Sequence, residues 1–308
     1  MPYRIVFLIL LLTAISIQAQ WEGRLYPFIE LTDEMLAEID LKDGSVEDWL
    51  DVLGEPTLTP LDFATPPSLP KYDPSSFDFR IWLAWHDAGN HLFVAAEMVD
   101  DIHVHNEEYW IRHPKFPPTE ASVWFNVDAD KSGGPMIEFD ENGMINRDIL
   151  MVQAQQYWGV AKNYKSDSNL SLQLLSGEAP WITYVPYADG GGSIVDSRPI
   201  FYVVEFYVTP FDRLIWDAPE QSIASDLSVG EQIGFAMAMT DKDSVIDQFM
   251  SDNLHSLFGP DGSWDLGSDL GWRSDHWAQG ILLGPGGRTE GTAVESLSWA
   301  RIKSSLSR

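Results

Sequence analysis

The sequence predicts an all-β fold, an antiparallel jelly-roll β-sandwich with long irregular loops. Three observations predict it: a hairpin pattern over Phe79–Asp101, further β-type segments at irregular spacing, and no helices alternating with them. In the hairpin, apolar side chains recur at every second residue from Phe79 to Trp85, which is the period of a pleated strand. His86–Asn90 supplies the turn, because Gly and Asn tolerate a positive φ, and His91–Val99 forms the return strand.

Other elements are predicted by the same reasoning on both sides of the hairpin. A helical spacing of apolar residues predicts a short helix within Glu30–Ile39, which Thr32 or Asp33 can cap. The Gly-rich stretch Gly177–Asp196 predicts a loop. Further strands are predicted over Ala121–Asp128, Val152–Trp158, Pro199–Thr209, Glu231–Thr240 and Trp277–Leu283.

The chain begins with the pattern of a secretory signal. Arg4 precedes the apolar run Ile5–Ile15, and Ala19 ends an acceptable cleavage site. The run is shorter than the roughly 20 residues of a membrane span, so we expect a secreted or periplasmic protein with no membrane span. The expected organisation is a signal peptide over residues 1–19, an N-terminal extension over 20–38, one β-sandwich over 39–284 and a tail over 285–308.

Composition narrows the classes of function. The chain has no cysteine, which excludes disulfides, thiolate metal sites and covalent haem attachment. Its net charge of −28, from 47 acidic and 19 basic residues, repels phosphate backbones, so nucleic acid is not an expected partner. The acidity is explained either by solubility or by binding of divalent cations in carboxylate-rich loops. Protein partners are not identified by the sequence.

Taken in order, the segments resemble carbohydrate-binding module family 9 (CBM9) and its wider superfamily of jelly-roll domains. The resemblance covers most of Ile39–Leu283. The matching pieces are Ile39-Asp40 with Asp48-Trp49, Phe79–Asp101, Ser122–Asp128, Tyr202–Phe206, Ile233–Met237, Gly271–Arg273, Trp277 and Gly280. The resemblance implies a slot in which two tryptophans clamp a sugar ring, with calcium ions nearby and a carbohydrate as the ligand.

The resemblance places Trp272 at the position of one clamp tryptophan. The position of the other falls at Pro118, and Trp110 or Phe116 of the same loop are the candidates to replace it. The acidic residue that the family carries in the following strand is Trp124 here.

A second interpretation of the same loop comes from the residues themselves. Trp264 and Trp272 lie among Gly, Ser and Asp, which favours exposed rings that stack on a pyranose. Arg273 and Asp275 would then hydrogen-bond adjacent hydroxyls. In the alternative, both tryptophans cap the edge of the sandwich core.

The turn after the strand at Ala121–Asp128 matches the first half of a calcium loop. Asp128, Asp130 and Ser132 supply oxygens at alternate positions, followed by a glycine for the bend. Phe139 stands where an acidic residue would close a complete loop of this kind. The candidate cofactor is therefore calcium, and the alternative is an ordinary turn built on aspartates.

Three functions follow from these observations. The leading one is an exported, non-catalytic protein that binds a xylan- or glucan-like saccharide by aromatic stacking, accessory to polysaccharide degradation. The second is electron transfer through a b-type haem held by Met237, Met239 or Lys242, as in another branch of the superfamily. The third is an activity associated with glycoside hydrolysis, although the chain carries no recognisable catalytic motif.

Overall fold

The structure is a computed structural model that describes residues 24–64, 72–102, 122–162, 168, 170–176, 179–195, 198–241, 253–257 and 272–287. The predicted signal peptide and the loops that carry Trp110 and Trp264 lie outside these residues. Within the described part of the chain, no helix is long and apolar enough to cross a membrane.

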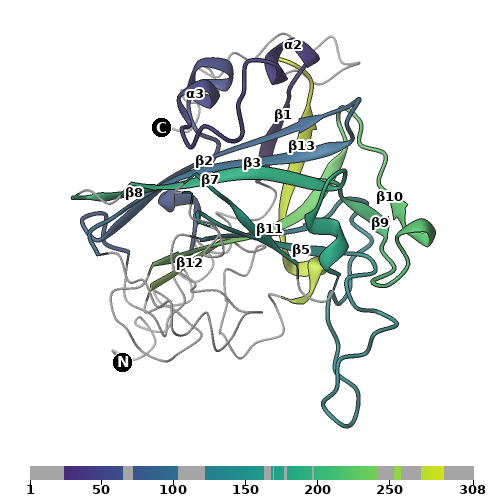
Figure 1. The fold of residues 1–308 in the computed structure, drawn as a ribbon. Helices are drawn as coiled ribbons and strands as arrows, with labels where there is room; N and C mark the ends of the chain where they lie inside the picture. The colour runs from purple at the N-terminus through teal and green to yellow at the C-terminus, as the bar shows by residue number, and fades with distance from the viewer. Residues whose placement is uncertain are drawn as a thin grey trace, which may run out of the picture.

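Strands dominate the described residues (Figure 1). The strands are β1 (Leu25–Glu30), β2 (Phe77–His86), β3 (His91–Asp100), β4 (Ser122–Asp128), β5 (Gln155–Val160), β6 (Gln173–Leu175), β7 (Ala188–Val195), β8 (Ile200–Val208), β9 (Phe211–Arg213), β10 (Ile223–Ala224), β11 (Gln232–Asp241), β12 (Asn253–Leu257) and β13 (Ala278–Leu283). The helices are α2 (Asp33–Leu36) and α3 (Glu47–Leu53), with 3-10 turns η1 (Pro60–Asp62), η2 (Pro180–Thr183), η3 (Pro219–Gln221) and η5 (Ser274–His276).

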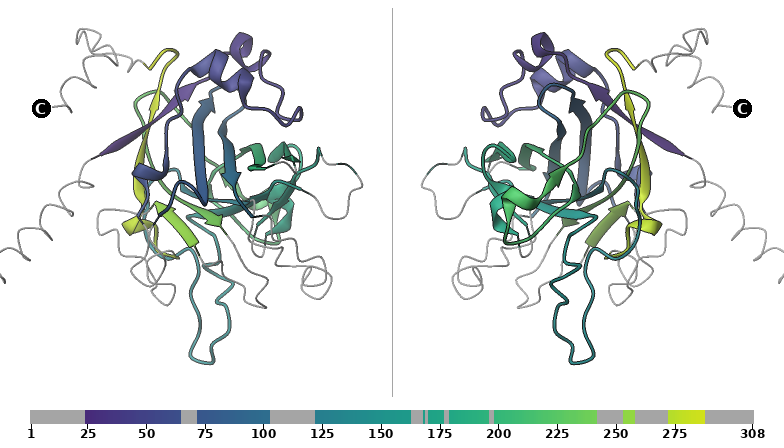
Figure 2. Two further views of the ribbon diagram at one scale, coloured as in Figure 1. Left: turned by 90° about the vertical axis from the view of Figure 1, so that its left-hand side faces the viewer. Right: turned by 90° about the vertical axis from the view of Figure 1, so that its right-hand side faces the viewer.

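One continuous sheet folds over itself to form the sandwich. Its order is β6-β5-β4-β11-β13-β1-β2-β3-β8-β7, with β12 paired to β11. The β4–β5 half packs onto β8: the rings of Phe125 and Phe206 lie 6.5 Å apart, and the Tyr157 hydroxyl donates to the Thr209 carbonyl at 2.8 Å. Figure 2 shows the sheet curling around this interior. The predicted fold class, an antiparallel jelly-roll β-sandwich with long loops, is confirmed.

The predicted hairpin is β2 and β3. The two strands pair from Phe77 opposite Asp100 to His86 opposite His91. Asn90 takes a positive φ of 53° in the turn, as its residue type allows. The alternating apolar side chains of β2 are buried in the core between the two halves of the sheet. This local pattern was sufficient to place both strands.

Strand β1 departs from the antiparallel pattern. It lies between β13 and β2 and pairs with both in parallel. The sequence assigns these residues to an N-terminal extension, whereas they form a central strand of the sheet. Tyr26 and Phe28 point into the core, and the Phe28 ring meets Phe235 edge-on at 5.3 Å. Pro27 lies within this strand and weakens its signal, because proline lacks the N–H that a sheet uses.

Helices α2 and α3 cover the outer face of the β2–β3–β8 part of the sheet (Figure 1). Helix α2 is shorter than the predicted segment, and Thr32 caps it by accepting a hydrogen bond from the Met35 N–H at 3.3 Å. Trp49 of α3 is fully buried and packs with Phe93 and Trp82 in a second, smaller core. This helical cap fixes the loop between α2 and α3 over the sheet.

The Gly-rich segment predicted to be a loop is strand β7. Its glycines are required by close approaches on both faces of the strand. A Cβ on Gly191 would lie 2.1 Å from the Leu41 carbonyl oxygen, and one on Gly190 would lie 2.1 Å from the Glu205 carbonyl oxygen. The glycines of β7 therefore allow the α2–α3 loop to pack closely against the sheet.

Candidate functional site

The two loops that the sequence singled out meet at one end of the sandwich. One loop follows β4 and carries the predicted calcium residues; the other contains Trp272 and η5. The Met136 N–H donates to the Trp272 carbonyl at 2.6 Å, and the Ser274 N–H donates to the Gly134 carbonyl at 2.8 Å. Pro135 and Arg273 form an antiparallel bridge between the loops. The described candidate sugar residues, Trp272, Arg273 and Asp275, therefore lie beside the candidate calcium residues.

Asp128 is the anchor of the first loop. Its carboxylate is buried and accepts the N–H groups of Ser132 at 3.2 Å and Gly133 at 3.0 Å. Asp130 accepts the Ser132 N–H at 3.0 Å. Burial raises the pKa of Asp128 to about 6, and the neighbouring Asp130 carboxylate adds to the rise. These bonds shape the turn, and the oxygens of Asp128, Asp130 and Ser132 stay predicted calcium ligands.

The second loop presents one aromatic ring beside an ion pair. Trp272 is partly buried and packs against the edge of the main core. The Arg273 guanidinium lies 2.7 Å from a carboxylate oxygen of Asp275, and this hydrogen bond lowers the pKa of Asp275. The other oxygen of Asp275 accepts the N–H of Gly134 from the first loop. The arrangement leaves Arg273 and Asp275 half-exposed beside the tryptophan.

The remaining predicted ligand residues are not placed. Trp110 and Trp264 lie outside the described residues, as does Lys242 of the haem alternative. The described partners in that alternative, Met237 and Met239, are buried in the main core between the two halves of the sheet. The two-tryptophan clamp stays a prediction. Of its candidate tryptophans, Trp272 is among the described residues.

Sequence reasoning did not identify a second aromatic feature, on the outer face of β4 and β5. Trp124 and Trp158 stand opposite each other on these strands, with ring centroids 4.6 Å apart and a 40° tilt. Both indole nitrogens are buried, and neither has a hydrogen-bond acceptor among the described residues. The signal available in the sequence was Trp124 itself, which replaces an acidic residue of the family pattern.

Asn126 extends this feature along β4 toward Asp128. It lies two residues from Trp124, and residues two apart share a face of a strand. Its side-chain oxygen is buried and has no donor in the described structure. We call the Trp124, Trp158 and Asn126 side chains the aromatic–amide face. Two donors and one acceptor on this face lack partners among the described residues, which is unusual for buried polar groups.

Comparisons with known proteins concern the whole fold. No family model matches the sequence, and no curated protein matches it. Among solved structures, the chain is similar to a carbohydrate-binding module of family 9 from Caldicellulosiruptor kristjanssonii in complex with cellotriose, with a TM-score of 0.48 and 14% identity over 88% of this chain and 98% of that one. It is also similar to a module of that family from the same organism in complex with glucose, with a TM-score of 0.46 and 14% identity over 87% and 99% of the chains. Both structures belong to the family that the ordered segments of this sequence resemble.

Proposed function

We propose that this chain is an exported, non-catalytic carbohydrate-binding protein that takes a glucan- or xylan-like saccharide. It would bind the saccharide on the aromatic–amide face and the adjoining Trp272 loop, and would serve as an accessory to polysaccharide degradation. The resemblance of the ordered sequence segments to CBM9 supports this proposal.

The main support for saccharide binding is the set of unpartnered polar atoms on the aromatic–amide face. The indole nitrogens of Trp124 and Trp158 are donors, and the side-chain oxygen of Asn126 is an acceptor, each buried and without a partner in the described residues. Leaving one such group unpaired costs about 1–3 kcal/mol. A saccharide offers hydroxyls that both donate and accept, together with flat C–H faces that pack on indole rings. A saccharide hydroxyl can therefore donate to the Asn126 oxygen or accept from an indole N–H.

The loop at the end of β4 supports the same ligand class. Arg273 and Asp275 supply donors and acceptors beside the partly buried ring of Trp272. A few polar groups placed around aromatic surface are typical of sites that orient small ligands. Calcium at Asp128, Asp130 and Ser132 would stiffen this loop, as its carboxylate-rich pattern suggests.

Isothermal titration calorimetry of the secreted protein tests the proposal. The ligands are glucose, cellotriose and xylotriose, because the two similar modules hold glucose and cellotriose. We expect binding heat with at least one of them and about a tenfold loss of affinity for Trp158→Phe, which keeps a ring but removes one indole donor. Tyr184→Ala is the matched control, since Tyr184 is an exposed aromatic residue outside both loops and the aromatic–amide face.

Two results would overturn the proposal. One is the absence of heat with all three saccharides at millimolar concentration. The other is equal affinity of Trp158→Phe, Trp272→Ala and the unchanged protein, which would place any binding elsewhere. Release of reducing ends from xylan or glucan by the purified chain would contradict its non-catalytic character.

A further inference from the structure

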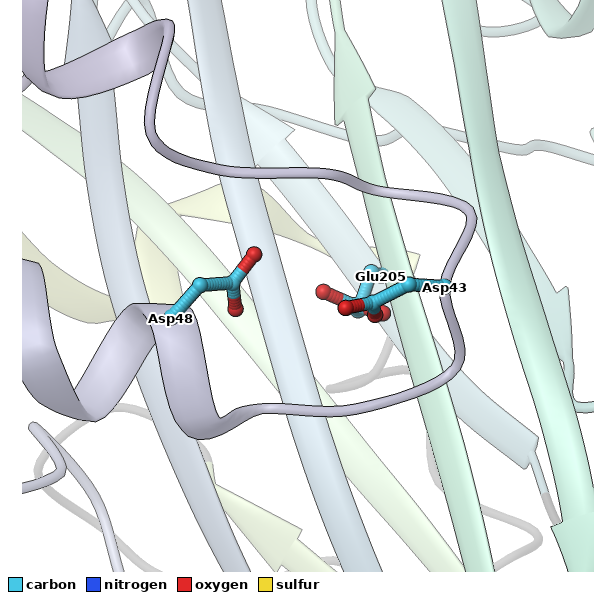
Figure 3. A group of neighbouring side chains, drawn as sticks. All are labelled: Asp43, Asp48 and Glu205. Carbon is cyan, nitrogen blue, oxygen red and sulfur yellow. The ribbon is translucent and has the colours of Figure 1, made fainter.

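A second group of acidic side chains lies under the helical cap, on the β3–β8–β7 part of the sheet. Asp43 comes from the α2–α3 loop, Asp48 from the first turn of α3, and Glu205 from the middle of β8. One carboxylate oxygen of each lies within 4.8 Å of the other two. Figure 3 shows Asp43 and Asp48 reaching in from the two sides of the loop, with Glu205 on the sheet beneath. Three elements far apart in the sequence thus direct carboxylates to one point.

Glu205 is the unusual member of the group, because its side chain is fully buried with 0% exposure. The Trp49 indole N–H donates to its Oε1 at 2.7 Å. Its Oε2 is buried and has no hydrogen-bond partner in the described residues. The residues beside it on the neighbouring strands are Ala95 and Gly191, which carry no polar side chain that could pair with Oε2.

The charged neighbours of Glu205 among the described residues are acidic. The charged groups that act on it are Asp48, Asp43 and Asp40, all acidic. Lys42 of the same loop is engaged with Asp189, at 2.6 Å. The buried carboxylate therefore lacks a cationic partner among the described residues.

We propose that Asp43, Asp48 and Glu205 together bind one divalent cation of the calcium class. Calcium is held by oxygen ligands at about 2.3–2.6 Å, so two ligand atoms of one ion lie at most about 5 Å apart. The three ligand atoms lie within 4.8 Å of one another, which is inside this limit. The donor set consists of carboxylates alone, which favours hard cations over zinc or copper. The cation supplies both the missing partner of Oε2 and the missing positive charge.

Backbone and indole N–H groups hold the three ligands in place. The Ser45 N–H donates to Asp43 at 2.8 Å, and the Trp49 N–H donates to Asp48 at 2.8 Å. Each carboxylate keeps lone pairs for a metal after accepting these bonds. Partners of this kind orient metal ligands and raise affinity. Because Asp43 is exposed, water completes the coordination sphere on that side. The ion would fasten the α2–α3 loop to the middle of β8.

Calcium titration of chelator-treated protein tests the inference, with calcium chloride as the probe and magnesium chloride in parallel. We expect calorimetric binding and a rise in the melting temperature with calcium, since a cation that binds only the folded state stabilises it. Asp43→Asn and Asp48→Asn should each weaken binding about tenfold or more. Asp51→Asn is the matched control, because it removes the same charge from an exposed position of α3.

The variant Asp128→Asn distinguishes this site from the other calcium candidate, at Asp128. Asp128→Asn should leave calcium binding at the Asp43 group unchanged. A variant that loses saccharide affinity should likewise still bind calcium at the Asp43 group. The inference is overturned if neither cation binds, if Asp43→Asn and Asp48→Asn bind calcium as tightly as the unchanged protein, or if Asp128→Asn alone abolishes binding. None of these results depends on the proposed saccharide function, because no saccharide is present in the experiment.

Discussion

The hydrogen bond between Trp49 and Glu205 gives the sharpest test of how the helical cap is held on the sheet. Trp49→Phe keeps an aromatic ring in the second core but removes the donor that meets Glu205 Oε1 at 2.7 Å. Both Glu205 oxygens would then be buried without a partner. The lost bond costs about 1–3 kcal/mol, and the smaller ring adds a cavity term. We expect a total destabilisation of about 2–4 kcal/mol.

Urea denaturation followed by circular dichroism measures this loss, with chelator present so that cations do not contribute. A double-mutant cycle with Glu205→Leu isolates the bond, because the double variant removes both polar groups. We expect a coupling free energy of about 1–3 kcal/mol. Trp181→Phe is the matched control, since its indole donates to a backbone carbonyl at 2.9 Å in a half-buried position. A Trp49→Phe loss below about 0.5 kcal/mol, or additivity of the two substitutions within that margin, would show that this bond does not hold the cap on the sheet.

Three further predictions concern stability. Gly191→Ala should destabilise the fold by about 1–3 kcal/mol, because its Cβ would lie 2.1 Å from a backbone oxygen. Gly234→Ala should change the free energy of unfolding by less than about 1 kcal/mol, since the nearest atoms to its Cβ lie at 3.4 Å. Chemical denaturation of the two variants compares these values. Burial lowers the pKa of His91 to about 4 from 6.5, so the unfolded state binds more protons and stability falls as pH drops through this range. His91→Gln should lack that loss, and parallel pH profiles would contradict it. Gln155→Leu should cost about 2–4 kcal/mol by thermal melting, because both backbone groups of Phe211 would lose their 2.9 Å partners; a loss under about 1 kcal/mol would contradict it.

The hairpin and the later strands were predictable because their signals are local. Alternation along β2 and the turn around Asn90 depend on neighbouring residues alone, and the structure places them as expected. Strand β1 was not predictable in this way, since Pro27 interrupts its pattern and its partners lie far along the chain. Strand β7 was missed because glycine usually marks loops. In this strand Gly191 is needed because the Leu41 carbonyl oxygen leaves no room for a Cβ.

The candidate sites likewise differ in whether their signals are local in the sequence. The turn at Asp128 and the loop at Trp272 carry local motifs, and their contact with each other emerges only from the fold. The Asp43 group had no local motif, because its members are brought together by packing of the cap on the sheet. A single signal was present: Glu205 stands alone among apolar residues in β8, where an acidic side chain is costly to bury.

Saccharide binding on the aromatic–amide face can be followed directly by NMR of the indole N–H groups. Signals of ¹⁵N-labelled protein are assigned by single Trp→Phe variants and followed as cellotriose is added. We expect the indole signals of Trp124 and Trp158 to shift together and saturate, while that of Trp181 stays in place, because its N–H already has an acceptor. Unmoved Trp124 and Trp158 signals at saturating saccharide would show that the saccharide does not bind on this face.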